Sequence, residues 1–111
     1  MKTTFFVRTL AVFSVLAAPC FADTTFDDTL LEAQSGNPLA QRELGILYAN
    51  GSGTPQDNIN AYIWLSAAKH NGDDIAAKNI PILKKHMSLQ EILKGQARAA
   101  RCIGSNYQHC K

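Results

Sequence analysis

The chain has 111 residues, of which 46% are hydrophobic and 18% charged, and its formal net charge is +2 at pH 7. A small, nearly neutral chain of this composition fits one globular domain. Its charge balance gives no indication of general binding to nucleic acid or to anionic membranes.

Residues 1–22 have the pattern of a secretory signal peptide. Two basic residues lie within the first eight, an apolar run covers about residues 10–18, and Cys20 and Ala22 are the small residues before a predicted cleavage after Ala22. The run is shorter than the roughly 20 apolar residues that a membrane span needs. A lipoprotein signal with Cys20 as the lipidated residue is the alternative, which the proline directly before it disfavours. We expect a bacterial Sec-type signal, a periplasmic or secreted protein, and no stable membrane span after cleavage.

Cleavage would leave residues 23–111 as one domain of 89 residues, which is 111 less 22. It would remove two of the eleven basic residues and none of the nine acidic ones, so the formal charge would become zero. Residues 23–77 hold eight acids and two bases, whereas residues 78–111 hold seven bases and one acid. This polarity suits a partner of complementary charge or head-to-tail association, although solvated helix faces are the simpler explanation.

Taken in chain order, the sequence predicts an all-helical protein, and no segment alternates as a strand would. A first helix is expected over residues 27–34, with Gly36 as its left-handed C-terminal cap. Asn37 and Pro38 then suit the N-cap and first turn of a second helix over residues 39–50. Apolar residues of that helix recur at three-and-four spacing and predict one buried stripe, formed by Ala40, Leu44, Leu47 and Tyr48.

The segment GSGTPQD at residues 51–57 ends this helix, and Asp57 can cap a third helix over residues 58–70. Apolar residues cover much of the third helix, which indicates a helix packed between neighbours. They are Ala61, Tyr62, Trp64, Leu65, Ala67 and Ala68.

Gly72 and Asp73 repeat the arrangement of stop and cap before a fourth helix over residues 74–86, which Pro81 should kink or interrupt. The tetrapeptide SLQE at residues 88–91 is a capping box for a fifth helix. The apolar residues noted on that helix are Ile92, Leu93, Ala97, Ala100 and Cys102.

An internal correspondence at an offset of 36 residues is the most informative pattern. The paired positions are Gly36 with Gly72, Asn37 with Asp73, Ala40 with Ala76, Leu44 with Ile80, and Leu47 with Leu83. Ala33 and Ala68 keep the register to within one residue. A period near 36 residues built from helix, turn and helix is typical of an α-solenoid, in which each unit buries its apolar face against the next.

These residues resemble the Sel1-like repeat family, whose pattern of small, glycine and aromatic positions is nearly complete over residues 37–72. The matching positions are Gly36, Ala40, Gln41, Leu44, Gly45, Tyr48, Gly51, Gly53, Pro55, Gln56, Asp57, Ala61, Trp64, Ala67, Ala68 and Gly72. The resemblance implies α/α helical hairpins of the tetratricopeptide type and a role in protein–protein interaction.

The second unit departs from the family pattern, because Ile80 and Pro81 stand where Leu-Gly is expected. Residues 73–102 therefore resemble a degenerate repeat with a capping helix, followed by a cysteine-bridged tail at 102–111. With about one and a half repeats, the large concave groove of longer members is not expected.

Cys102 and Cys110 are the only cysteines left after cleavage, and an even count in an exported protein favours a disulfide. The alternative is a metal site that adds His109, although three donors are few for such a site. Some cysteine-rich relatives with the same Cys-x7-Cys spacing are described as binding or hydrolysing penicillins. That resemblance implies a bridge that staples two helices and takes no part in catalysis.

Three other features could indicate a ligand site: a glycine-containing turn, a group of aromatic residues and the histidines. Gly51-Ser52-Gly53 lacks the third glycine and the preceding strand of a dinucleotide loop, and no Walker lysine follows it. Tyr48, Tyr62 and Trp64 could form an aromatic ligand platform. The repeat register instead indicates that Tyr48 and Trp64 are core residues.

The histidines His70, His86 and His109 have no nucleophile beside them except Cys110. His70 and His86 fall near predicted helix ends, where a cation is favoured by the helix dipole and a surface or capping role is expected.

We therefore expect a non-enzymatic, exported scaffold or adaptor that needs no cofactor or metal and binds protein and not nucleic acid. The proposed partner surface is the exposed side of the second helix, formed by Arg42, Glu43, Ile46 and Asn50, with the basic C-terminal half as the other option. The remaining alternatives are a β-lactamase-like or penicillin-binding protein and an envelope-stress or structural factor without a single partner.

Overall fold

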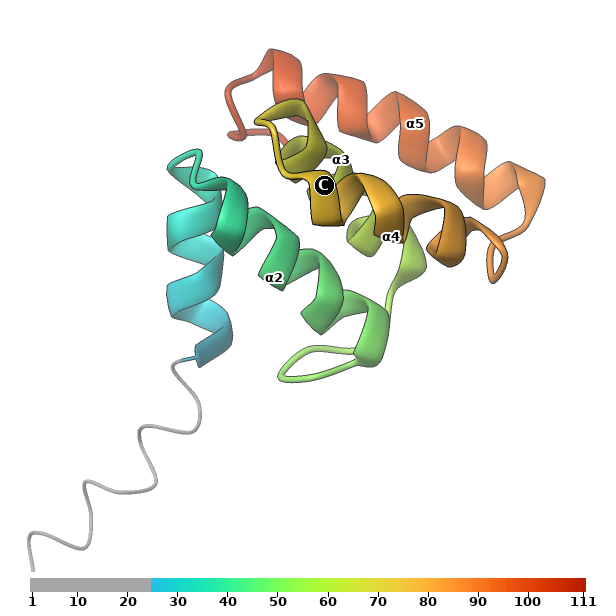
Figure 1. The fold of residues 1–111 in the computed structure, drawn as a ribbon, viewed down its shortest axis with the longest axis horizontal. Helices are drawn as coiled ribbons and strands as arrows, with labels where there is room; N and C mark the ends of the chain where they lie inside the picture. Colours follow the sequence, from blue (N-terminus) through green and yellow to red (C-terminus); the bar gives the residue numbers. More distant parts are fainter. Residues whose placement is uncertain (1–24) are drawn as a thin grey trace, which may run out of the picture.

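The computed structural model describes residues 25–111, and these residues form helices joined by turns, with no strand among them (Figure 1). The helices are α2 (Pro38–Asn50), α3 (Asn58–His70), α4 (Asp74–Lys84) and α5 (Leu89–Gly104), and residues 25–34 form a further helical segment before α2. The predicted signal peptide lies outside the described residues. An all-helical fold is thus confirmed for the described part of the chain.

The predicted caps form as the sequence indicates. Asn37, Asp57 and Asp73 each accept a hydrogen bond from a backbone amide in the first turn of α2, α3 and α4, respectively. In the capping box of α5, Ser88 Oγ accepts from the amide of Glu91 at 3.1 Å, and a Glu91 carboxylate oxygen accepts from the amide of Ser88 at 2.7 Å. These contacts satisfy amides that have no partner within their own helix.

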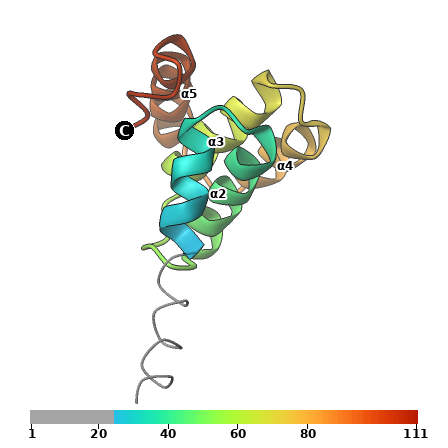
Figure 2. The ribbon, with the colours of Figure 1, turned by 90° about the vertical axis from the view of Figure 1, so that its left-hand side faces the viewer.

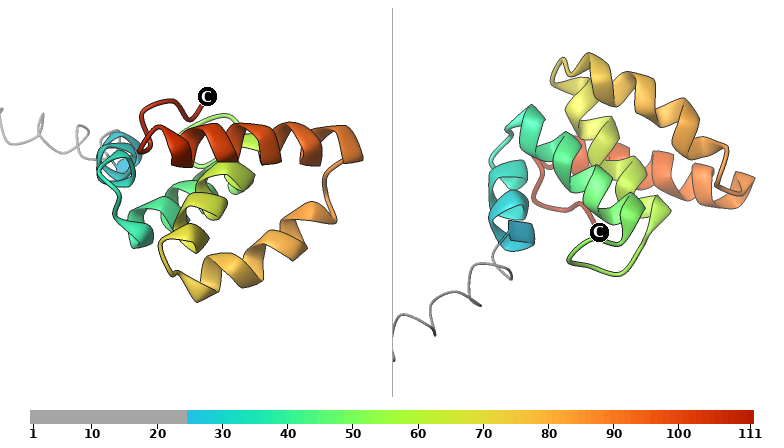
Figure 3. Two further views of the ribbon diagram at one scale, coloured as in Figure 1. Left: turned by 90° about the horizontal axis from the view of Figure 1, so that it is seen from above. Right: turned by 60° about the horizontal axis from the view of Figure 1, so that its bottom comes forward.

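Helix α3 lies at the centre of the fold and packs against α2, α4 and α5 (Figures 1 and 2). All of its predicted apolar residues are buried, and so is Ile63. One core cluster joins α3 to the segment 25–34, α2 and the C-terminal tail, and a second joins it to α4 and α5. Figure 3 shows α4 and α5 diverging from the turn that connects them, with α3 beside both.

Two glycines let neighbouring helices approach α3 closely. A Cβ atom built at Gly45 of α2 would lie 2.8 Å from Leu65 Cγ, and one at Gly95 of α5 would lie 2.9 Å from a ring carbon of Tyr62. Both distances are shorter than carbon atoms tolerate, so a larger side chain at either position would require the helices to move apart.

Three sequence expectations need correction. Pro81 does not interrupt its helix, because α4 continues through it to Lys84. That helix ends before the expected residue 86 because residues 85–87 form the turn to α5. The buried face of α5 is formed by Gly95, Ala99 and Cys102, whereas Leu93 is 55% exposed, since the contact with α3 selects small residues at three-and-four spacing. Ala97 and Ala100 are exposed as well.

Within residues 25–111, the structure contains no helix with the length and apolar character needed to span a bilayer.

Candidate functional site

A groove of about 480 Å3 lies between α2 and α4, with the start of α3 at its floor. It contains Ile46 and Asn50 of the predicted partner surface. Its walls carry apolar side chains from three helices, namely Ile46, Ala49, Leu65, Ile82 and Leu83. Ile46 is 37% exposed and Ile82 is 57% exposed, so both have apolar surface available for contact.

The polar residues of the groove are almost all amides. They are Asn50, Gln56, Asn58 and Asn79, and the remaining polar residue is His86. Asn58 donates to the carbonyl of His86 at 3.3 Å and accepts from Gln56 at 2.6 Å, which fixes one end of the groove. Within the described residues, the side chains of Asn50 and Asn79 make no hydrogen bond, so their donors and acceptors face an open groove. No Asp, Glu, Lys or Arg lines it.

An ion pair outside the lining of the groove joins α2 to the N-cap of α4. Arg42 Nη1 donates to both carboxylate oxygens of Asp73, at 2.8 and 3.1 Å. Asp73 also caps α4, because its Oδ1 accepts from the amide of Ala76 at 2.8 Å. Arg42 therefore has a structural contact, while 21% of its side chain remains exposed.

The four predicted partner residues do not form one surface. Ile46 and Asn50 line the groove, whereas Arg42 does not line it and is paired with Asp73. Glu43 lies on another side of α2, in a shallow depression against the helical segment 25–34, together with Asp28 and Glu32. The exposed face of α2 is thus divided between two sites.

The groove residues on α4 were missed by sequence reasoning, although a signal for them existed. The 36-residue offset pairs Ile46 with Ile82 and Asn50 with His86. Both members of each pair line the groove. Applying the offset to polar and exposed positions, and not only to glycine and alanine, would have found them.

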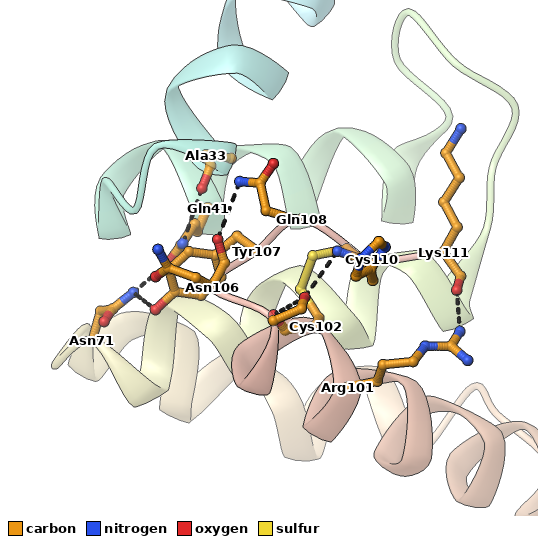
Figure 4. Close-up of a disulfide and its surroundings, with 12 residues drawn as sticks. Ala33, Gln41, Asn71, Arg101, Cys102, Asn106, Tyr107, Gln108, Cys110 and Lys111 are labelled. Carbon is orange, nitrogen blue, oxygen red and sulfur yellow. Dashed lines mark hydrogen bonds between the residues drawn. A yellow bond between two sulfur atoms is a disulfide. The ribbon is translucent and has the colours of Figure 1, made fainter.

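A polar network around the buried side chain of Gln41 fixes the C-terminal tail (Figure 4). Gln41 is fully buried, donates to the carbonyl of Ala33 at 3.0 Å and accepts from Asn71 at 2.9 Å. Asn71 also donates to the hydroxyl of Tyr107 at 2.7 Å. The network links four segments of the chain, and a buried polar group of this kind is stable only when its hydrogen bonds are made.

Asn106 and Tyr107 have positive φ angles of 57° and 67°, which turns the chain back toward the core after α5. Positive φ is unfavourable for a residue with a Cβ, so this turn needs support from its surroundings. The hydrogen bond from Asn71 and the burial of the Tyr107 ring supply that support.

The predicted disulfide between Cys102 and Cys110 is confirmed. It joins α5 to the tail and not one helix to another, since the described chain has no helix after α5. Because both sulfur atoms are bonded, neither is a free thiolate for metal binding or nucleophilic attack. No group of three metal-ligating side chains occurs within residues 25–111.

The Gly51-Ser52-Gly53 segment forms the turn between α2 and α3. Gly51 and Gly53 have φ angles of 70° and 76°, and the amide of Asp57 donates to the carbonyl of Tyr48 at 2.9 Å to close the hairpin. Tyr62 and Trp64 are buried in the core, whereas Tyr48 is half-buried and its pKa is raised above 10.0, mainly by burial and also by the nearby carboxylate of Asp57. His70, His86 and His109 are all exposed.

No family model matches the chain, and neither a curated protein nor a solved structure gives a match. Functional inference therefore rests on the residues and on the geometry described above.

Proposed function

We propose that the protein is an exported Sel1-like repeat scaffold that binds a short, extended segment of a partner protein in the groove between α2 and α4. The observation that carries this proposal is the composition of the groove. It offers exposed apolar side chains beside amide groups and no Asp, Glu, Lys or Arg.

This composition suits an extended peptide. A peptide in extended conformation presents a backbone N–H and a C=O at every residue, and an asparagine side chain can donate to one and accept from the other. Asn50 and Asn79 stand on opposite walls of the groove and can each hold the backbone, while Ile46 and Ile82 contact an apolar side chain of the peptide. A partner segment without charged residues fits best.

The repeat assignment is supported by equivalent structural roles at an offset of 36 residues. Gly36 and Gly72 have φ angles of 97° and 94°, and each immediately precedes an N-cap residue. Ala40 and Ala76 lie in the first turn of the helix that follows each N-cap, and both are buried. Helices α2 and α4 then stand as first helices of successive hairpins, and first helices of stacked hairpins line an inner face on which extended partners bind.

Export is supported by the disulfide together with the signal-like pattern of residues 1–22. Structural disulfides persist in the periplasm and outside the cell and are rare in the cytosol. The two sulfur atoms lie in the core, as expected of a structural bridge.

Selection from a library of random linear peptides tests the binding function. Residues 23–111 with the disulfide intact serve as bait, and the affinity of enriched peptides is measured by fluorescence anisotropy. We expect enrichment of uncharged peptides with an apolar residue. Placing a carboxylate in the groove by Ile46→Asp or Ile82→Asp should weaken binding about tenfold or more.

Leu93→Asp is the control matched to Ile82→Asp, because Leu93 is about as exposed as Ile82 but lies on α5 and does not line the groove. Its binding should equal that of the unchanged protein. Failure to enrich any peptide, or equal loss of affinity in all three variants, would contradict the proposal.

A further inference from the structure

A second cavity, of about 540 Å3, lies on the other side of α3 from the α2–α4 groove. The helical segment 25–34 and the C-terminal tail form facing walls, and α3 contributes the edge of Trp64. The volume falls in the range of about 300–1,000 Å3 that small-molecule pockets occupy. Neither the repeat pattern nor the proposed peptide binding assigns it a role.

The inner part of this pocket is aromatic. Phe26 and Tyr48 meet edge to face with ring centroids 5.5 Å apart, and both line the cavity with Trp64 and Leu30. Trp64 is only 2% exposed, so its ring is anchored in the core and just its edge reaches the pocket. Flat aromatic surfaces of this kind favour a planar apolar ligand, because stacked and edge-to-face contacts add to the burial of area.

The outer part of the pocket is basic. Arg101 and Lys111 line it with His109, and no Asp or Glu does. Arg101 donates to a main-chain oxygen of Lys111, which holds the guanidinium at the mouth and leaves most of its five N–H groups for other acceptors. The side chains of Arg101 and Lys111 carry two positive charges, which exceed the single negative charge of a terminal carboxylate on Lys111.

No Asp or Glu lines this pocket, and the nearest carboxylate with a known effect on it is that of Asp57 beside Tyr48. Asp28 and Glu32 line the depression between the segment 25–34 and α2. The carboxylate of Asp57 accepts hydrogen bonds from the backbone amide and the side-chain amide of Asn60. The amide side chains of Gln34 and Gln108 add uncharged donors to the pocket wall. The electrostatic potential at the mouth therefore favours an anion.

We propose that this pocket binds a small aromatic acid, with its ring against Phe26 and Tyr48 and its acidic group at the guanidinium of Arg101, while Lys111 adds a second positive charge to the pocket lining. The disulfide belongs to the site, because Cys110 lines the pocket and the bridge holds the tail that carries Lys111. This site is separate from the peptide groove, so the two proposals succeed or fail independently.

A matched pair of dyes tests the proposal. Anilinonaphthalene sulfonate carries an anionic group on a flat aromatic body, and N-phenyl-1-naphthylamine is the same body without the charge. Binding is followed as quenching of Trp64, the single tryptophan of the chain. We expect the sulfonate to bind in a saturable manner with one site, and the neutral dye to bind at least about fivefold more weakly.

Arg101→Gln and Lys111→Gln should each weaken binding of the sulfonate by up to about fivefold. Arg98→Gln and Lys94→Gln are matched controls on α5, since neither residue lines the pocket, and both should bind as the unchanged protein does. Ile82→Asp alters only the α2–α4 groove and should also have no effect.

Circular dichroism and urea midpoints establish that each variant is folded. Equal affinity for both dyes, loss of binding in the control variants, or loss in Ile82→Asp would each overturn the proposal.

Discussion

Replacing Gly45 by alanine tests whether the close approach of α2 to α3 determines the stability of the fold. The new Cβ would lie 2.8 and 3.0 Å from two carbons of Leu65 and 3.2 Å from the main-chain oxygen of Ala61. The leucine can change rotamer, but the carbonyl can move only if the helix moves. Such overpacking costs about 1–3 kcal/mol.

An opposing gain must be subtracted from this cost. Alanine is favoured over glycine within a helix by about 1 kcal/mol. The expected net loss of stability for Gly45→Ala is therefore about 1 kcal/mol. Urea unfolding of residues 23–111 without reductant should show it as a midpoint lower by about 0.5–1 M.

Gly104→Ala provides the control for helix propensity. Gly104 is the last residue of α5, and no heavy atom lies within 4 Å of a Cβ built there. The same substitution should then be neutral or stabilising by up to about 1 kcal/mol. If Gly45→Ala stabilises the protein as Gly104→Ala does, the argument from close approach is refuted.

A double-mutant cycle identifies the contact responsible. Leu65→Ala removes the carbons nearest to the new Cβ and alone should cost about 2–5 kcal/mol. In that background Gly45→Ala should lose most of its cost, because contacting residues are not additive. An unchanged cost would assign the strain to the carbonyl of Ala61.

Two further predictions concern the tail and the half-buried tyrosine. Replacing both Cys102 and Cys110 by alanine should lower the free energy of unfolding by about 2–3 kcal/mol, the chain-entropy value for a loop this short, and a urea midpoint equal to that of the bridged protein would contradict it. The pKa of Tyr48 is raised in the folded state by burial, then by Asp57, so its stabilising contribution is complete below the unfolded value of 10.0 and is lost as pH rises through the folded pKa. Urea midpoints of the unchanged protein should therefore fall more steeply above about pH 10 than those of Tyr48→Phe, and parallel curves would refute this.

Local signals in the sequence predicted the helices well. Each of Asn37, Asp57 and Asp73 caps the helix expected after it, and α3 has the predicted bounds. Capping depends on residues within one turn, so it can be recognised without knowledge of the fold.

Contacts between distant segments could not be predicted in the same way. Arg42 and Asp73 are 31 residues apart, and nothing local distinguishes a paired arginine from a free one. On α5, hydropathy pointed to Leu93, whereas the contact with Tyr62 demands a residue without a side chain at Gly95. A glycine has almost no weight in a hydropathy pattern, so Gly95 was not among the apolar residues noted on that helix.

The candidate site was predicted in part. Ile46 and Asn50 were identified as exposed residues of one helix, but a groove needs two walls and the second wall comes from α4. The pocket beside Trp64 was not predicted, because the segment 25–34 and the tail that enclose it are far apart in the sequence.

The tail has a consequence for the order of events during synthesis. The core cluster around Ala33 and Leu44 is completed by Cys102, Tyr107 and Cys110 from the last ten residues. A growing chain therefore cannot complete that cluster before residues 102–110 have been added, and the disulfide cannot close before Cys110. Until then the residues around Ala33 and Leu44 remain only partly packed, so the final packing of this cluster and the closure of the disulfide belong to the same late stage of folding.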